Sequence, residues 1–227
     1  MDPGNKSKIT ERRKEQSLTP EEKEITRSLE NLKFLRIRDL IFIVLIWRKL
    51  KTASPVEFSL EPTEEELKKF KETIKKAGLF VPDNPVIDTK HYKSGGKKIY
   101  FVASNKKDLD LISKLWFGDH VKDPKVYKEV GRMSGFPDTA IETYDKFTRL
   151  PDPERRKVGN ELTLSPEEKK KLFSGDTYYF SLFFYMSRDH WQTESETIKK
   201  WAEEIRRLTP GLYKAYIDDF KKREERN

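Results

Sequence analysis

Two short helical patterns joined by a tight hinge lie within residues 123–147 and limit how the middle of this chain can fold. Asp123 followed by Pro124 is typical of a helix start, because the carboxylate accepts from free N–H groups and proline has no N–H to leave unpaired. Gly135 can take the left-handed conformation that ends such a helix, and Pro137 cannot continue it. A second helix restarts directly after this proline, with an aspartate in its first turn. The sequence therefore predicts a helical hairpin.

The absence of cysteine narrows the chemistry available to this chain of 227 residues. Disulfides, iron–sulfur clusters, cysteine nucleophiles and cysteine-ligated zinc are all excluded. Charged residues make up 38% of the chain, and 47 basic against 39 acidic side chains give a net charge of +8. Because lysines and glutamates are mostly interleaved, much of this charge indicates solvated helix surfaces, although contact with nucleic acid is permitted. We expect a soluble, cytoplasmic protein.

Helix starts with a capping residue recur along the chain. A hydroxyl residue followed three positions later by glutamate satisfies two free N–H groups at once. This pattern begins four segments, which are Thr19–Glu22, Thr63–Glu66, Ser165–Glu168 and Thr193–Glu196. Asn105 is expected to cap a further helix, and Thr209 precedes a proline that begins the last one. Helices are therefore expected to dominate.

Two apolar runs fit either a helix or a strand. Leu40–Trp47 is far shorter than the roughly 20 apolar residues of a membrane span, so no span is expected. We expect a buried helix that continues from Thr19, with a central strand as the alternative. Thr177–Met186 is densely aromatic, so we expect a core strand there, with a buried helix as the alternative.

The remaining patterns predict a small sheet. Pro55–Leu60 alternates in strand fashion, and a Gly-Gly turn within residues 90–98 leads into the apolar strand Ile99–Ala103. Val81–Lys90 is expected to be a loop, and Pro151–Asn160 an exposed connector. The expected fold class is therefore α+β, mostly helical with a small β-sheet.

The expected domain organisation is one globular domain with an appended arm. Residues 1–18 are polar and basic without an apolar period, which predicts a mobile arm. Residues 19–227 then form a single domain, with a helical N-terminal part at residues 19–80.

Because the chain has no cysteine, the candidate groups for catalysis are histidine and carboxylate side chains. No glycine-rich phosphate loop, nucleophile elbow or metalloprotease helix is present in the sequence. The fold would have to assemble an acid–base or metal site from distant positions, because adjacent residues point to different faces. The candidate catalytic residues are His120, Asp138, Glu142, Asp189 and His190. We favour exposed loop histidines over such a site, and we expect neither a bound metal nor a cofactor.

A basic segment before the apolar strand is the candidate binding surface. Its binding residues are Lys90, His91, Tyr92, Lys93, Lys97 and Lys98. Ammonium groups there could contact phosphates while an aromatic ring stacks on a base. The alternative, which we favour, is a hairpin edge that lysines protect from edge-to-edge association.

The hinge also resembles a motif of a known family. Residues 131–140, GRMSGFPDTA, resemble the Gly-x-Leu-Leu-Gly-Tyr-Pro-x-Cys-Cys segment of an uncharacterised prokaryotic family. Residues 184–193, FYMSRDHWQT, are similar in placement to that family's later His-x-Pro-Cys-x-x-x-Cys segment. The similarity covers roughly Ile99 to Phe220, a family-like part in which the order of elements matches better than the residues do.

The resemblance implies a shared fold without the family's thiolate chemistry. Paired cysteines in family members suggest a metal or redox centre. Here Thr139 and Ala140 stand at the first pair, and Met186 and His190 stand at or near the second. The resemblance further implies that the hinge and the Met186–His190 segment meet.

Two hypotheses for function follow. The first is a non-catalytic binding module on a degenerate metal-site scaffold, whose macromolecular partner, nucleic acid or protein, contacts the arm and the basic hairpin. The second is an enzyme of unknown reaction with a histidine–carboxylate site near residues 131–142. Clustering of the candidate residues around one cleft would favour the enzyme, and scatter over the surface would favour the binding module.

Overall fold

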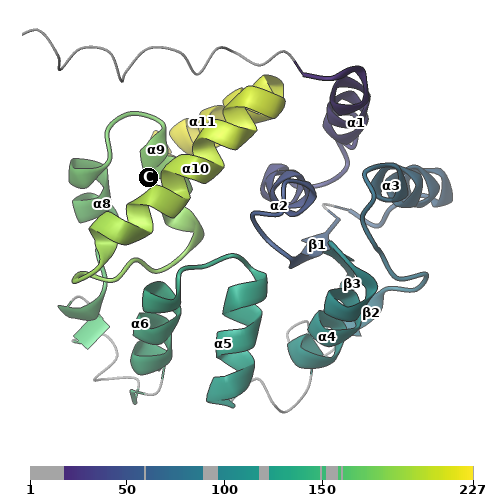
Figure 1. The fold of residues 1–227 in the computed structure, drawn as a ribbon. Helices are drawn as coiled ribbons and strands as arrows, with labels where there is room; N and C mark the ends of the chain where they lie inside the picture. The colour runs from purple at the N-terminus through teal and green to yellow at the C-terminus, as the bar shows by residue number, and fades with distance from the viewer. Residues whose placement is uncertain are drawn as a thin grey trace, which may run out of the picture.

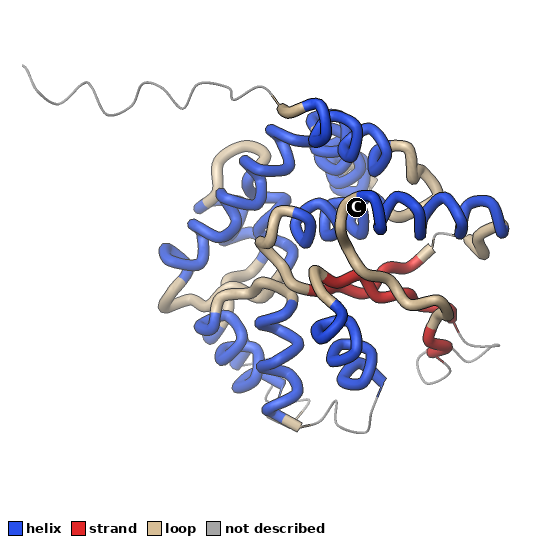
Figure 2. The backbone as a smooth tube through the Cα atoms, turned by 45° about the vertical axis from the view of Figure 1, so that its right-hand side comes forward, coloured by secondary structure: helices blue, strands red, loops and turns tan. Residues whose placement is uncertain are grey.

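Helices dominate the structure, and a three-stranded sheet lies among them (Figures 1 and 2). The computed structural model describes residues 18–58, 60–88, 97–117, 123–148, 150–151, 158–159 and 161–226. In chain order its elements are α1 (Pro20–Glu30), α2 (Ile37–Trp47), β1 (Ala53–Glu57), α3 (Glu64–Lys76), β2 (Val86–Asp88), β3 (Lys97–Ala103), α4 (Lys106–Phe117), α5 (Pro124–Met133), α6 (Asp138–Thr148), α8 (Pro166–Leu172), α9 (Thr177–Phe180), the 3₁₀ turn η2 (Ser181–Phe183), α10 (Trp191–Leu208) and α11 (Pro210–Glu224). The predicted fold class, α+β and mostly helical with a small β-sheet, is confirmed.

The sheet is covered on both faces. Its strand order is β1-β3-β2, and both strand pairs are antiparallel. The register places Ala53 opposite Ala103 in one pair and Val86 opposite Ile99 in the other. Because side chains alternate along a strand, Tyr100 and Val102 join the main core, whereas Ile99 and Phe101 pack with α4 on the opposite face. Figure 2 shows helices on both sides of the strands.

The helix α2 lies at the centre of the main core and contacts β1, α10 and α11 (Figure 1). Its fully buried residues are Ile41, Ile43, Val44, Leu45 and Ile46. The same core extends from Ile25 in α1 to Ile217 in α11, so it joins both ends of the described chain. The apolar run at residues 40–47 is thus a buried helix, as expected. Within the described ranges, no helix has the length and apolar content needed to cross a membrane.

The expectation that this helix continues from Thr19 is wrong. The first helix ends at Glu30, and α2 begins at Ile37. Between them, Leu35 forms an isolated β-bridge with Phe58. This contact joins residues that are distant in sequence, so the local pattern could not show where the first helix stops.

The end of α2 holds a non-glycine residue in the left-handed conformation. Lys49 has a φ of 57°. Its backbone N–H donates to the Ile46 carbonyl at 2.9 Å, and the Leu50 N–H donates to the Leu45 carbonyl at 2.8 Å. This pair of hydrogen bonds is a common way to close a helix. The chain turns sharply there and carries Lys51 into the interior.

Three of the four predicted capping boxes are confirmed. In each, the hydroxyl oxygen and the glutamate carboxylate accept from each other's backbone N–H. The pairs are Thr19 with Glu22, Thr63 with Glu66 and Ser165 with Glu168. The box at Thr193 is wrong, because α10 begins at Trp191 and Thr193 lies inside its first turn. Asn105 accepts from the Asp108 N–H at 2.9 Å, as predicted for the start of α4.

The predicted core strand over Thr177–Met186 is wrong, and the alternative of a buried helix describes most of it. The run forms α9 and η2. Phe180 is fully buried, with its ring centroid 5.5 Å from that of Tyr213 and 5.1 Å from that of Tyr216. Aromatic residues are common in strands because they suit half-buried surfaces. Here the helix α11 provides that surface, so tertiary packing overrides the local preference.

The predicted hinge between two helices is confirmed. The Asp123 carboxylate caps the start of α5. Gly135 has a φ of 71°, and its N–H donates to the Arg132 carbonyl at 2.8 Å. The Phe136 N–H donates to the Gly131 carbonyl at 3.1 Å, which completes the helix-ending motif. The chain then enters α6, and α5 and α6 stand side by side (Figure 1).

The sheet matches its prediction in part. The strand β1 overlaps the predicted Pro55–Leu60 segment but begins two residues earlier, and β3 contains the predicted strand Ile99–Ala103. The strand β2 lies within Val81–Lys90, so the expectation of a loop there is wrong for three residues. Three predicted segments lie outside the described residues: the Gly-Gly turn, residues 1–17 of the arm and most of the 151–160 connector.

Replacing Gly135 with alanine should destabilise the protein more than the same change at Gly78. Both glycines are left-handed, with φ of 71° and 69°, so both variants carry backbone strain of about 1–2 kcal/mol. A Cβ at position 135 would lie 2.3 Å from the Leu50 carbonyl oxygen, whereas one at position 78 would meet nothing within 4 Å. We therefore expect Gly135→Ala to cost at least ~1 kcal/mol more. Urea unfolding measures both losses, and equal losses would show that the contact with Leu50 carries no weight.

Candidate ligand-binding cleft

Four of the five predicted catalytic residues lie in the described part of the chain, and they do not line the cavity described below. Asp138, Glu142, Asp189 and His190 are all exposed, and none of them borders the cavity described below. Asp138 pairs with Arg132 at 3.0 Å. His120 lies outside the described residues. The choice between the binding module and the histidine–carboxylate enzyme stays a prediction.

Glu194 joins the hinge to the loop before α10. Its Oε1 accepts from the Thr139 hydroxyl at 2.7 Å, and its Oε2 accepts from the Ser187 N–H at 2.8 Å. Burial raises the pKa of the Glu194 carboxyl, and these two hydrogen bonds oppose the rise. Ala140 and Met186 both belong to the main core. The two segments of the resemblance therefore meet, but they meet around a carboxylate.

Lys51 closes the hinge from the other side. Its ammonium donates to the Ser134 carbonyl at 2.6 Å, at the C-terminal end of α5, where a cation offsets the helix dipole. The ammonium also lies 4.0 Å from the ring centroid of Phe42 and 4.8 Å from those of Phe136 and Trp201. Ring faces attract cations. We call these five residues the lysine cage.

The ammonium of Lys51 pairs with no carboxylate in the described chain. The residue is 2% exposed. Burial lowers the pKa of Lys51 to about 7, and the field of Arg38 acts in the same direction. Near neutral pH this side chain therefore exchanges between a cation and a neutral amine.

The lysine cage borders a cavity of about 1460 Å³, which we call the aromatic cleft. Small-molecule pockets commonly measure about 300–1,000 Å³, so space does not limit a ligand here. Its walls come from α2, β1, β3, α4, α5, α6, α8, η2 and α11 and from the segments between them. Aromatic residues on these walls include Phe42, Tyr127, Phe136, Tyr144, Phe183 and Tyr216. The cleft therefore offers mostly apolar surface.

A second buried lysine, Lys169, also lines the aromatic cleft. The ammonium of Lys169 donates to the Ser181 carbonyl at 2.8 Å and to the Phe184 carbonyl at 3.0 Å. Burial lowers the pKa of Lys169 to about 8, and the nearby Glu194 carboxylate opposes this change. The charge of Glu194 thus acts on Lys169, whereas no described carboxylate acts on Lys51 in this way.

The described wall of the aromatic cleft carries more positive than negative groups. Arg38, Lys51 and Lys169 line it, and its acidic residue is Glu57. Glu57 is engaged by Arg36 outside the cleft at 2.6 Å. The wall therefore suits a ligand with a negative group.

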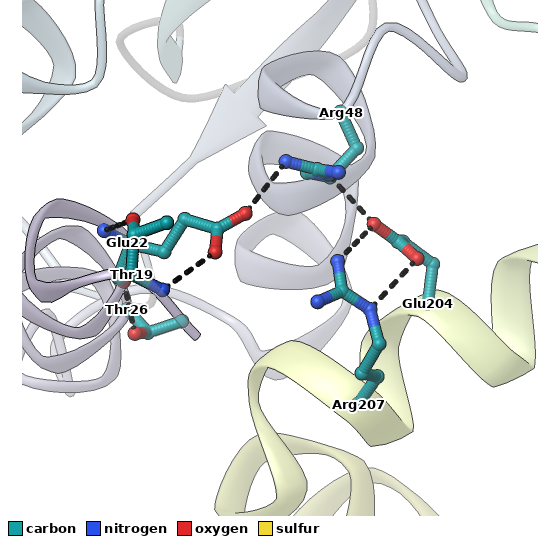
Figure 3. A network of polar contacts seen from close by, with 6 residues as sticks. All are labelled: Thr19, Glu22, Thr26, Arg48, Glu204 and Arg207. Carbon is teal, nitrogen blue, oxygen red and sulfur yellow. Dashed lines mark hydrogen bonds and ion pairs between the residues drawn. The ribbon is translucent and has the colours of Figure 1, made fainter. Parts of the chain in front are cut away.

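An ion-pair network fixes the end of α2 just before the lysine cage (Figure 3). Arg48 pairs with Glu22 of α1 at 3.1 Å and with Glu204 of α10 at 2.6 Å. Glu204 also pairs with Arg207 at 2.8 Å. Such partly exposed pairs contribute about 0–1 kcal/mol each. Their effect here is to hold three helices in one arrangement around the turn that delivers the buried lysine.

The predicted binding segment lies mostly outside the described residues. This applies to Lys90, His91, Tyr92, Lys93 and the side chain of Lys97. Lys98 is exposed, and its hydrogen bond with Glu61 raises the pKa of the lysine. Binding through this segment stays a prediction.

Sequence reasoning missed Lys51 altogether. The residue follows an apolar helix in a basic run, Arg48–Lys51, which is typical of a solvated helix end. Its hydrogen-bond partner Ser134 is 83 positions away. No local pattern could therefore identify Lys51 as buried.

No protein-family model, curated protein or solved structure matches this chain. The resemblance to the uncharacterised prokaryotic family stays a prediction. Because a fold alone does not determine a function, the chemistry of the aromatic cleft is the better indication of what this protein does.

The free energy of unfolding should depend on Lys51 above neutral pH. The folded pKa of about 7 lies below the ordinary value of 10.5, so the unfolded chain binds more protons between these limits. The stability contributed by this group therefore rises from about pH 7 to about pH 10.5, by up to ~1.4 kcal/mol per pH unit. Below that window both states carry the proton, and the full cost of burying the ammonium remains.

The variant Lys51→Met removes this titration while it keeps an apolar side chain of similar length. Wild type should gain stability relative to the variant between about pH 7 and about pH 10, as measured by urea unfolding. Lys169→Met makes the same substitution at the other buried lysine, whose pKa burial also lowers, so its stability difference should change with pH in the same direction. A stability difference that does not change with pH would mean that Lys51 keeps its proton throughout.

Purified protein should carry no stoichiometric zinc or iron, and a chelator should leave its melting temperature unchanged. In the described chain no group of three histidine, cysteine or carboxylate side chains could hold a metal. The imidazole of His190 alone cannot complete the four-coordinate shell of a structural zinc site. Elemental analysis that finds about one tightly held metal per chain would contradict this expectation and favour the enzyme hypothesis.

Proposed function

We propose that this chain is a non-catalytic binding protein whose ligand is an amphiphilic organic anion, such as a medium-chain carboxylate. The observation that carries the proposal is the buried ammonium of Lys51 on the wall of the aromatic cleft, where no described acid pairs with it. An anion in the cleft would supply the missing negative charge.

The apolar walls suit the body of such a ligand. Removing apolar surface from water contributes about 25 cal/mol for each Å² buried. Most of the surface that lines the cleft is apolar, so an alkyl chain or a flat ring can be buried against it. The apolar body would provide most of the affinity, and the head group would fix the orientation.

The positive side chains suit the head group. A carboxylate beside Lys51 would raise the pKa of that lysine, because an opposite charge favours the ammonium. Charge-assisted hydrogen bonds are stronger than neutral ones, and the apolar surroundings strengthen them further. A cationic head group would instead bring like charges together inside the cleft, which is a basis for discrimination.

The proposal leaves one of the two hypotheses from the sequence open and gives no support to the other. A nucleic-acid or protein partner for residues 1–18 and 90–98 remains a separate prediction, as does a cytoplasmic location. The histidine–carboxylate enzyme gains no support from the cleft, because its described candidates do not line it.

A fluorescent amphiphilic anion tests the proposal. Anilinonaphthalene sulfonate should bind the folded protein with an increase in fluorescence, and dodecanoate should displace it. Dodecanol and dodecyltrimethylammonium have the same chain with a neutral or a positive head group. We expect each of them to bind about tenfold more weakly than dodecanoate, which corresponds to about 1.4 kcal/mol.

A matched pair of variants isolates the role of the buried lysine. Lys51→Met should lose the preference for dodecanoate over dodecanol and should still bind dodecanol. Lys214→Met makes the same substitution at an exposed lysine and should change nothing. Equal displacement by all three head groups would show that Lys51 does not select anions. Displacement by none of them would reject the proposal.

A further inference from the structure

Lys51 is also placed to react with a carbonyl group. We propose that it forms a reversible imine with a ligand that carries an aldehyde or ketone into the aromatic cleft. This inference rests on the proposed binding function, because the apolar body of the ligand has to occupy the cleft. It adds a covalent step to that function.

The lysine cage holds the amine at the cleft wall. Ser134 accepts one of its hydrogens at 2.6 Å, and ring faces surround the nitrogen at 4.0 to 4.8 Å. Phe42, Lys51, Ser134 and Phe136 all line the cleft. A flexible side chain is thus fixed before any ligand arrives, which lowers the entropic cost of bringing the reacting atoms together.

The reaction needs a neutral amine, and the surroundings favour that form. Burial and the positive charge of Arg38, on α2, lower the pKa of Lys51 to about 7. The side chains that α2, the hinge and α10 place around the nitrogen, Phe42, Phe136 and Trp201, are uncharged. A lysine with this lowered pKa carries a far larger neutral fraction near pH 7 than an ordinary lysine does. Desolvation and a neighbouring cation are the two usual ways to activate a lysine for this chemistry.

The step is balanced without an oxidant or a reductant. The nitrogen lone pair adds to the carbonyl carbon, and the two amine hydrogens leave with the carbonyl oxygen as water. The imine then takes a proton from solvent to become an iminium, and hydrolysis returns the amine and the carbonyl compound. The iminium cation keeps a hydrogen for the Ser134 carbonyl and faces the same rings as the ammonium did.

Reductive trapping on the wild-type chain tests this inference. Dodecanal is added with sodium cyanoborohydride at about pH 7, and the reductant converts any imine into a stable secondary amine. Peptide mass mapping then locates the adduct. We expect Lys51 to be modified at least about tenfold faster than exposed lysines, in line with its larger neutral fraction. Dodecanoate should slow the adduct at Lys51 and leave the exposed lysines unaffected.

Two variants serve as controls. Lys51→Arg keeps a cation but has no primary amine, so it should form no adduct at this position. Lys214→Arg changes an exposed lysine that does not line the cleft and should leave the Lys51 adduct in place. If Lys51→Arg does not fold, the map of the wild-type adducts still decides the question.

The outcomes separate the imine from the binding function. Selective modification of Lys51 supports the imine, whether or not dodecanoate binds. A failure of dodecanoate to bind would by itself reject only the preference for anions. Displacement by dodecanoate with Lys51 modified no faster than exposed lysines overturns the imine and leaves the binding function standing. Neither displacement nor selective modification overturns both.

Discussion

The contact between the Lys51 ammonium and the Ser134 carbonyl positions the middle of this molecule. Burying an unpaired charge costs several kcal/mol unless polar groups or ring faces surround it. One carbonyl and three rings do so here, and the Thr52 N–H adds a hydrogen bond to the Met133 carbonyl at 2.9 Å. The turn after α2 is thereby fixed against the end of α5. The α5–α6 hairpin, and with it one wall of the aromatic cleft, is held in place by the N-terminal part of the chain.

Two further buried charges, Glu194 and Lys169, join neighbouring segments of the core. Glu194 connects α10 to α6 and to the Ser187 backbone, and Lys169 connects α8 to the carbonyls at the end of the aromatic run. Backbone groups, rather than close ion pairs, satisfy most of these charges. Burial shifts the pKa of each toward the neutral form. Binding of an anion near Lys51 would therefore be accompanied by proton uptake around neutral pH.

Features that depend on a few consecutive residues could be predicted from the sequence, and features that depend on distant partners could not. The cap at Thr63 and the left-handed Gly135 need only their neighbours, and both were predicted. The aromatic run at residues 177–186 has a composition typical of strands, but its Phe180 ring packs against Tyr213 and Tyr216 of the helix α11. Glu194 lies in a capping pattern but turns inward to a hydroxyl of another helix. No pattern near Lys51 in the sequence predicts that this lysine is buried. Neither the aromatic cleft nor the buried ammonium on its wall could therefore be predicted from the sequence.

The close approach of the Leu50 carbonyl to Gly135 also limits how this sequence can change over time. The oxygen occupies the place where a side chain at position 135 would begin. Any residue other than glycine there requires the turn after α2 to move first, and that movement would carry Lys51 out of its cage. The residue at position 135 and the conformation of the turn after α2 therefore depend on each other. A descendant that loses the glycine is expected to have remodelled the turn, and with it the cleft.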